Sequence, residues 1–432
     1  MYRDGFMRLL AAAVAALPFM AWAQSTDFAI VGVTVKVGDG RQVENALVIV
    51  REGKIVSVSP GGQAPSGMAT VKGAGKFLYP GFIDAYSTRL TKTAPEPSLD
   101  GRPDVTTQAQ ATMWAGNLKG IFGGFSASEN LDFDRDNSSF ENGITTTLLV
   151  PNKGAIRGSA ALVNLLPAAE KDRILNTEVG FGLSYRAGAG SGYPSNILGV
   201  IALMRQTLTD AKSTADGADV GAPPAALKGL QSLAPLVTGK KPGIFESNFD
   251  REIERSMRLA EEFGFKFMVA GGRDAHKVAP MLKLNSIPVL LQVDYLDQPT
   301  VTPDADSVPP ADRQPLEYKQ ERLARWQEQI KGSQVLASAG VDFAFSSGTQ
   351  PSQYLKNVRR LIKQGLSTEA ALKAMTVTPA KLFGASDKVG SIETGKLANL
   401  VLMSGPFESE ASVVESVWIS GKMVTEAKEA GK

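Results

Sequence analysis

The sequence predicts an α/β fold, a (β/α)8 TIM-like barrel joined to a small β-sandwich domain that both ends of the mature chain build together. Three observations lead to this prediction: both ends of the chain are rich in short strands, the middle alternates strands with helices, and the chain has 432 residues. A barrel of this kind takes about 250 residues or more as one unit, so the length accommodates a barrel and one companion domain.

The two ends of the chain have the same β-rich texture. Three strand patterns near the start, at 29–36, 46–51 and 54–58, are separated by glycine-containing turns, and two more occupy 398–403 and 413–424. Neither end has enough strands to bury a core alone, so we expect both to pair into one composite β-sandwich. The predicted parts are residues 24–79 for its first part, 80–388 for the barrel and 389–432 for its second part.

The middle of the chain reads as successive strand and helix units. Residues 143–150 form a β-branched, buried strand pattern, and in the helix 250–263 the apolar positions Ile253, Met257 and Ala260 fall on one face. Further strands are expected at 243–248, 265–269, 287–292 and 341–345, and further helices at 274–284, 321–339, 352–364 and 368–376. Two polar, proline-containing stretches, 211–224 and 297–314, are expected to be loops. Repeated crossovers of this kind favour a parallel sheet closed into a barrel.

The first residues have the pattern of a cleavable signal peptide. Arg3 and Arg8 precede an apolar stretch, 9–22, which ends in Ala21-Trp22-Ala23, an A-x-A cleavage pattern. A membrane anchor is the alternative, but about 20 apolar residues are needed to span and Pro18 interrupts a shorter run. We therefore expect residues 1–23 to be removed, no membrane span to remain, and the protein to be periplasmic or secreted.

Charge and composition exclude several classes of function. Lys and Arg number 46 against 44 Asp and Glu, a net charge of +2, and no long basic run is present, so nucleic acid is not an expected partner. The chain has no cysteine, which excludes disulfides, cysteine ligands and cysteine nucleophiles. It has one histidine, His276, so a metal site built from several imidazoles cannot be assembled.

Two motifs resemble those of the amidohydrolase superfamily, and in particular its imidazolonepropionase-like branch. The first is Phe77-Leu-Tyr-Pro-Gly-Phe-Ile-Asp84, which would open the barrel. The second is Thr376-Val-Thr-Pro-Ala-Lys-Leu-Phe-Gly384 followed by Gly390-Ser-Ile-Glu-Thr-Gly-Lys396, which would close it. The resemblance implies a barrel with a composite β-sandwich. It also implies hydrolysis of non-peptide C–N bonds or dipeptides by hydroxide formed on zinc or another divalent metal.

The metal ligands that the resemblance implies are absent from this sequence. The two histidines after the first barrel strand fall on Tyr86 and Thr88, and the histidines of the fifth strand fall on Glu246 and Asn248. The histidine after the sixth strand falls on Gly271 or its neighbour Gly272, and the aspartate after the eighth strand falls on Gly348. We therefore expect these former metal positions to line the barrel mouth without a metal, and no cofactor is predicted.

Three ionisable residues remain as candidate catalytic groups: Glu246, His276 and Asp84. Together with Asp274, the two carboxylates could supply oxygen ligands for magnesium, manganese or calcium. The alternative is that Asp84 is a structural hydrogen-bond acceptor, that Asp274 caps its helix, and that His276 has a structural role. The cationic, glycine-rich segment 152–158 could bind an anion at the barrel mouth or simply form a turn.

Two functional hypotheses follow. The first is an exported amidohydrolase-like protein that is a noncatalytic subunit or binding protein, with an active relative, a second copy or a small molecule as its partner. The alternative is a hydrolase with a metal-free or carboxylate-only site at the barrel mouth, in which Glu246, Asp84 or His276 acts as acid or base.

Overall fold

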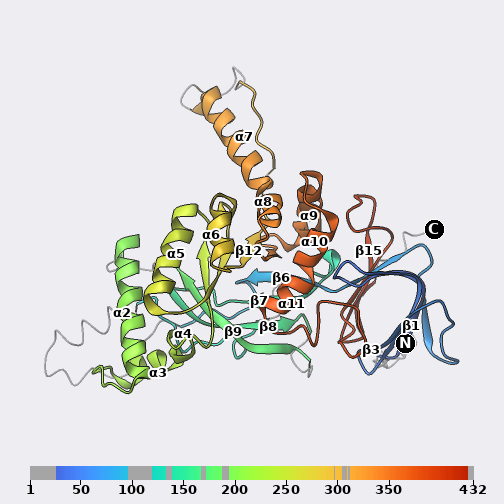
Figure 1. Cartoon of the computed structure of the whole chain (residues 1–432), viewed down its shortest axis with the longest axis horizontal. Coiled ribbons are helices and arrows are strands. Elements are labelled where there is room, and N and C mark those ends of the chain that lie inside the picture. The colour runs from blue at the N-terminus through green and yellow to red at the C-terminus, as the bar shows by residue number, and fades with distance from the viewer. Residues whose placement is uncertain are drawn as a thin grey trace, which may run out of the picture.

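The computed structural model describes residues 26–95, 119–132, 139–166, 172–186, 194–295, 297–303, 309 and 312–426 (Figure 1). The predicted signal segment, residues 1–23, lies outside this part of the chain. The described residues form an α/β structure with two eight-stranded sheets, one a barrel and the other a composite β domain. The predicted fold class is confirmed.

The composite β domain contains strands from both chain ends. Its strands are β1 (Phe28–Lys36), β2 (Gln42–Arg51), β3 (Lys54–Pro60), β4 (Ala69–Lys72), β5 (Phe77–Pro80), β14 (Leu400–Met403), β15 (Val414–Ile419) and β16 (Lys422–Glu426). They hydrogen-bond as one continuous sheet in the order β16-β15-β14-β5-β1-β2-β3, with β4 also paired to β1. The two ends meet where β5 pairs with β14, and Trp418 stacks on Phe28 in the core that the sheet encloses.

The barrel sheet runs from β6 to β13 in chain order. Its strands are β6 (Phe82–Ser87), β7 (Ile144–Leu149), β8 (Ile156–Asn164), β9 (Ile174–Ser184), β10 (Gly243–Ser247), β11 (Phe267–Gly271), β12 (Val289–Gln292) and β13 (Phe343–Ser346). One buried apolar cluster draws side chains from all eight strands, as the interior of a closed barrel requires. The Ser346 hydroxyl donates to the Tyr86 carbonyl at 2.7 Å and joins the last strand to the first.

One strand departs from the predicted all-parallel arrangement. β8 pairs antiparallel with both β7 and β9, whereas the other neighbouring pairs of this sheet are parallel. Its amino-terminal end therefore lies at the edge of the barrel where the other strands have their carboxyl ends. In this way a residue at the start of β8 reaches the barrel mouth.

Helices cover the barrel and connect its later strands (Figure 1). They are η1 (Phe140–Asn142), α2 (Ile197–Ala215), α3 (Pro224–Ser232), α4 (Ala234–Val237), α5 (Asp250–Phe263), η2 (Ala275–Val278), α6 (Ala279–Leu284), α7 (Leu316–Ile330), α8 (Gly332–Ser338), η4 (Pro351–Gln353), α9 (Tyr354–Lys363), α10 (Thr368–Met375) and α11 (Val377–Leu382). The predicted helix 250–263 is confirmed, and it ends at Gly264, whose φ is 73°.

Two predicted segments differ from the structure. Residues 211–215 belong to the last turn of α2, so the predicted loop 211–224 begins later than expected; Leu208 and Ala211 are buried and extend the helix. The predicted helix 321–339 is two helices, α7 and α8, separated at Lys331. Figure 1 shows α7 projecting from the body of the molecule, which the break permits.

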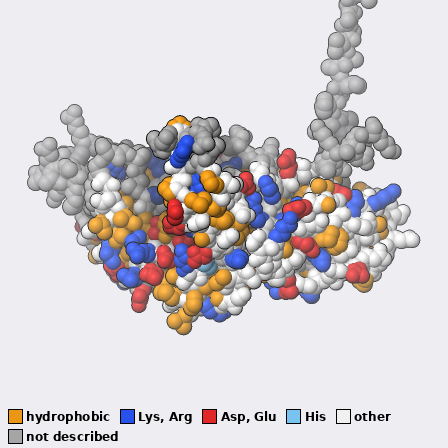
Figure 2. All heavy atoms as spheres, turned by 90° about the horizontal axis from the view of Figure 1, so that it is seen from above, with side chains coloured by type: hydrophobic (Ala, Val, Ile, Leu, Met, Phe, Trp, Pro, Cys, Tyr) orange, Lys and Arg blue, Asp and Glu red, His pale blue; other side chains and the backbone are white. Residues whose placement is uncertain are grey.

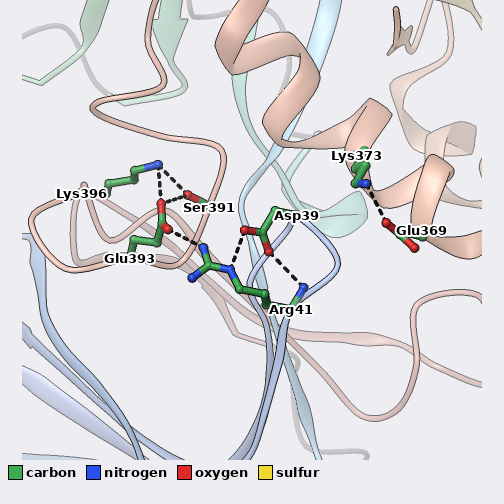
Figure 3. A network of polar contacts seen from close by, with 7 residues as sticks. All are labelled: Asp39, Arg41, Glu369, Lys373, Ser391, Glu393 and Lys396. Carbon is green, nitrogen blue, oxygen red and sulfur yellow. Dashed lines mark hydrogen bonds and ion pairs between the residues drawn. The ribbon is translucent and has the colours of Figure 1, made fainter. Parts of the chain in front are cut away.

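A polar network joins the β1–β2 turn to the exit loop of the barrel (Figure 3). Arg41 contacts Asp39 at 2.6 Å and Glu393 at 2.5 Å, while Lys396 contacts Glu393 at 2.9 Å. Hydrogen bonds from Lys396 and Ser391 and from Arg41 lower the pKa of the Glu393 carboxyl to about 2. The closing Gly-Ser-Ile-Glu-Thr-Gly-Lys motif is therefore a structural link between the two ends of the β domain.

Acidic and basic side chains are intermixed over the face shown in Figure 2, with no broad patch of one sign. Among the described residues, no helix combines the length and the apolar character that crossing a membrane requires.

Candidate functional site at the barrel mouth

Two of the predicted former metal positions meet around one cation. The Tyr86 hydroxyl donates to Glu246 Oε2 at 3.2 Å, although 160 residues separate them in the chain. Arg157 contacts both: its Nη1 donates to the Tyr86 hydroxyl at 2.8 Å, and its Nη2 lies 2.6 Å from Glu246 Oε2. The Arg157 side chain is 4% exposed, so its guanidinium forms a buried ion pair.

Strand geometry explains how these side chains converge. Side chains alternate along a strand, so Glu246 on β10 points to the same face as Ile244, which is part of the barrel interior. The register of β6 shifts between Asp84 and Ser87, and Tyr86 packs against the interior cluster. Arg157 comes from the second residue of β8, the antiparallel strand.

A second arginine contacts the other oxygen of the Glu246 carboxylate. Arg186, two residues beyond the end of β9, places Nη2 2.8 Å from Glu246 Oε1. Burial alone would raise the pKa of Glu246, but the charges of Arg157 and Arg186 outweigh it and lower that pKa. Burial raises the pKa of Tyr86 well above its ordinary value, so its phenol stays protonated and donates. We name these four residues, Tyr86, Arg157, Arg186 and Glu246, the mouth cluster.

The mouth cluster does not fit a divalent metal. Of the six former metal positions only Glu246 carries a carboxylate, and each of its oxygens already faces a guanidinium, at 2.6 Å and 2.8 Å. A fixed positive charge at that distance opposes a divalent cation. Across the described residues, no group of three or more His, Asp or Glu side chains lies close enough to hold a metal ion.

Asp84 lies behind the mouth and is 4% exposed. It accepts hydrogen bonds from the Ser347 backbone N–H at 3.0 Å and the Ser347 hydroxyl at 2.5 Å, and so ties β6 to the end of β13. Burial raises its pKa to about 6 despite these bonds. A cavity of about 10 Å³, lined by Asp84 and Thr147 among others, lies beside it and has room for about one water molecule. The structural interpretation of Asp84 therefore has direct support.

Gly348 packs against an acidic residue from a neighbouring strand. Asp294, two residues after β12, accepts from Gln292 Nε2 at 2.7 Å and from the Thr349 hydroxyl at 3.1 Å, and Arg273 lies 3.1 Å from its other oxygen. A Cβ on Gly348 would lie 2.5 Å from Asp294 Oδ2, and the φ of Gly348 is +62°. The position that the resemblance assigns to an aspartate is thus filled by the carboxylate of Asp294.

Gly271 packs against the Asn248 side chain in the same way that Gly348 packs against Asp294. The φ of Gly271 is +96°, and a Cβ there would lie 2.5 Å from Asn248 Oδ1. That oxygen is buried and has no hydrogen-bond partner among the described residues. Gly272, the alternative position, has no room for a side chain either, because a Cβ would meet Val289 at 2.6 Å. Thr88 follows β6 and is half-buried.

His276 and Asp274 lie apart from the mouth cluster, at the root of α7. His276 Nε2 is 3.3 Å from Glu328 Oε1, and its ring is 7% exposed. Asp274 occupies the position before η2, but its side chain makes no capping bond, so the expected N-cap role is wrong. Its carboxylate instead accepts from Gln329 Nε2 at 3.0 Å and pairs with Lys277 at 3.4 Å. Asp274 therefore anchors the projecting helix α7 through Gln329, and His276 lies beside Glu328 of the same helix without a hydrogen bond from either ring nitrogen.

Sequence reasoning missed the arginines and Asp294. Arg157 lies in the segment 152–158, for which a turn or an anion site was expected, and the start of an antiparallel strand was not anticipated. The cationic character of that segment was the available signal, since a buried arginine needs a carboxylate partner. Arg186 and Asp294 follow strands β9 and β12, where the carboxyl ends of parallel strands meet.

Comparison with known proteins agrees with this architecture. A model of the amidohydrolase family matches residues 318–424. An amidohydrolase from Thermotoga maritima MSB8 superposes with a TM-score of 0.69 at 21% identity, covering 92% of this chain and all of that one. A Xaa-Pro dipeptidase with bound methionine superposes with a TM-score of 0.53 at 12% identity, covering 93% and 100%. At these identities the structures establish the fold alone.

Curated relatives match over a short segment. Adenine deaminase 1 from Carboxydothermus hydrogenoformans is 39% identical over 69 residues, and adenine deaminase 2 from Jannaschia sp. is 34% identical over 70. Each match covers 16% of this chain and 11% of the relative, so the chain corresponds to a small part of their length. The chain shares the overall fold of the solved structures named above. The comparisons thus show similarity to the amidohydrolase family over residues 318–424 and a shared fold over 92% of the chain.

Proposed function

We propose that this chain is an exported, noncatalytic member of the amidohydrolase superfamily, of the imidazolonepropionase-like branch, that acts as a binding protein or as a subunit beside an active relative. One observation carries the proposal: a guanidinium stands between two former metal positions, Tyr86 and Glu246, at 2.8 and 2.6 Å. The single positive charge of Arg157 neutralises the Glu246 carboxylate, which would otherwise be the candidate metal ligand.

A guanidinium can replace the charge of a metal but not its chemistry. Metal-bound water is acidic enough to give hydroxide near pH 7, whereas arginine coordinates no water and does not deprotonate in proteins. Glu246, paired with two arginines, has a lowered pKa and is a weak base. The mouth cluster therefore keeps its polar contacts but has no means to generate hydroxide.

Export is supported by the sequence of residues 1–23, with Arg3 and Arg8 before an apolar stretch and Ala21-Trp22-Ala23 at its end. Mass spectrometry of the protein expressed with its natural start tests this. A mature chain that begins near Gln24 and is released from the periplasm is the expected result, and an uncleaved chain in the cytoplasm contradicts it.

The absence of catalysis is tested with amides, lactams and dipeptides, with and without added zinc, manganese or nickel. We expect no turnover above the uncatalysed rate. The alternative, a metal-free hydrolase, predicts turnover that Glu246→Ala or Asp84→Asn abolishes while Arg205→Gln, on the surface pair with Glu262, leaves it unchanged. Turnover with that pattern of loss would replace the proposal.

A further inference from the structure

We infer that Arg186 is the contact residue of a binding site for a small monocarboxylate at the barrel mouth; this inference rests on the proposed noncatalytic function. The site has one more cation than its carboxylate needs. Arg157 already neutralises Glu246 through Oε2 at 2.6 Å, so Arg186, at 2.8 Å from Oε1, brings a surplus positive charge.

The two arginines differ in their access to solvent. The Arg157 side chain is 4% exposed and its donors go to Gly154, Tyr86 and Glu246, whereas the Arg186 side chain is 74% exposed. Glu246 is the contact that the described residues make with the Arg186 guanidinium. The arginine side of this pair lies in solvent, although Glu246 is only 14% exposed, so a ligand can reach the Arg186 guanidinium from the solvent side.

The chemistry of Arg186 selects the class of ligand. A guanidinium presents a planar fork of N–H donors that matches the two oxygens of a carboxylate. One surplus charge balances one negative charge, which suits a monocarboxylate better than a phosphate dianion. Arg157 and Glu246 then form the fixed, buried base of the site, and Tyr86 orients the carboxylate of Glu246.

A matched pair of small probes tests the inference: N-acetylglycine, a monocarboxylate, and N-acetylglycinamide, its neutral counterpart. The melting temperature is followed while each probe is titrated at low ionic strength, with inorganic phosphate as a third titration. Saturable stabilisation by N-acetylglycine alone is expected. In Arg186→Gln the apparent Kd for N-acetylglycine should rise at least about tenfold, because the charge-assisted hydrogen bonds from the guanidinium are lost.

Arg205→Gln is the control, because Arg205 is also an exposed arginine paired with a glutamate, Glu262, at 2.8 Å. It should keep the wild-type response. The inference is overturned if N-acetylglycine does not stabilise the wild type, if Arg186→Gln responds equally, or if phosphate or the amide stabilises as much. Zinc titration of the same samples separates the two proposals. Binding of one zinc per chain would contradict the noncatalytic function, whether or not N-acetylglycine stabilises the protein.

Discussion

Arg157 is the residue on which the barrel mouth depends most. Its guanidinium is buried beside Glu246, and a charge in that environment is stable only while it is paired. Buried pairs add little net stability when formed but are costly to break from one side. The cluster is therefore expected to be far more sensitive to loss of one member than to loss of both.

Arg157→Met tests this sensitivity. We expect the free energy of unfolding to fall by about 3 kcal/mol, the lower end for a broken buried pair, because Arg186 still neutralises Glu246. The double variant with Glu246→Gln should recover part of that loss. Urea unfolding measures both, with Arg205→Met as the surface control. A single variant within about 0.5 kcal/mol of the wild type, as surface changes usually are, would show that the pair is not a buried unit.

Asp84 gives the molecule a pH dependence of a particular sign. Its folded pKa of about 6 lies above the ordinary value, so the protonated form is favoured by folding. Its contribution to stability is complete below about pH 4 and is lost as the pH rises through about 6. Between pH 4.5 and 7.5 the wild type should lose on the order of 2 kcal/mol relative to Asp84→Asn.

The measurement is urea unfolding of wild type and Asp84→Asn at both pH values. Asp342→Asn is the control, because Asp342 is an exposed partner of Lys381. A difference between wild type and Asp84→Asn that stays constant with pH, or that grows in favour of the wild type as the pH rises, would contradict the raised pKa.

At the scale of elements, the ends of β11 and β13 are shaped by glycines that leave room for polar neighbours. Gly348 has a left-handed φ and faces Asp294, so Gly348→Ala suffers both backbone strain and a steric clash. Gly217→Ala, with φ of +86° and nothing within 4 Å, suffers the strain alone and is the matched control.

We expect Gly348→Ala to destabilise by about 2–3 kcal/mol and Gly217→Ala by about 1 kcal/mol, as measured by thermal or urea unfolding. Gly348→Asp, which restores the residue that the resemblance assigns, should be worse still, because it sets a carboxylate against Asp294. Equal costs for the two alanine variants would indicate that Asp294 does not occupy this space.

The sequence could predict those elements whose pattern is local, such as the apolar periodicity of one helix or strand, but not those set by contacts between distant segments. Helix 250–263 and the strands around it carry clear periodicity and were predictable. The direction of β8 was not, because strand pairing is set by long-range contacts. Arg157 lies in that strand, so its meeting with Tyr86 and Glu246 could not be foreseen. The break between α7 and α8 at Lys331 comes without a proline, and the local signal for it is the pair Gly332-Ser333 that follows, since glycine weakens a helix interior.

At the scale of the whole molecule, a barrel with its covering helices is joined to a composite β domain, and the mouth of the barrel carries fixed charges. The β domain joins both ends of the chain, and the exit-loop network at Glu393 fastens them (Figure 3). This scaffold is similar to that of the Thermotoga maritima amidohydrolase, and its mouth places Arg157 between two positions to which the sequence resemblance assigns metal ligands. The central claim is therefore that the fold was retained while the metal site was replaced by an ion-pair cluster.

The metal content of the purified protein tests that claim most directly. Protein isolated alone and with its cellular partners is incubated with excess zinc, exchanged into metal-free buffer and measured by elemental analysis, beside a zinc-binding hydrolase as a positive control. The account predicts far less than one zinc per chain in the isolated protein, with any zinc in the complex assigned to the partner. One tightly held zinc per isolated chain, lost on Glu246→Ala, would contradict it.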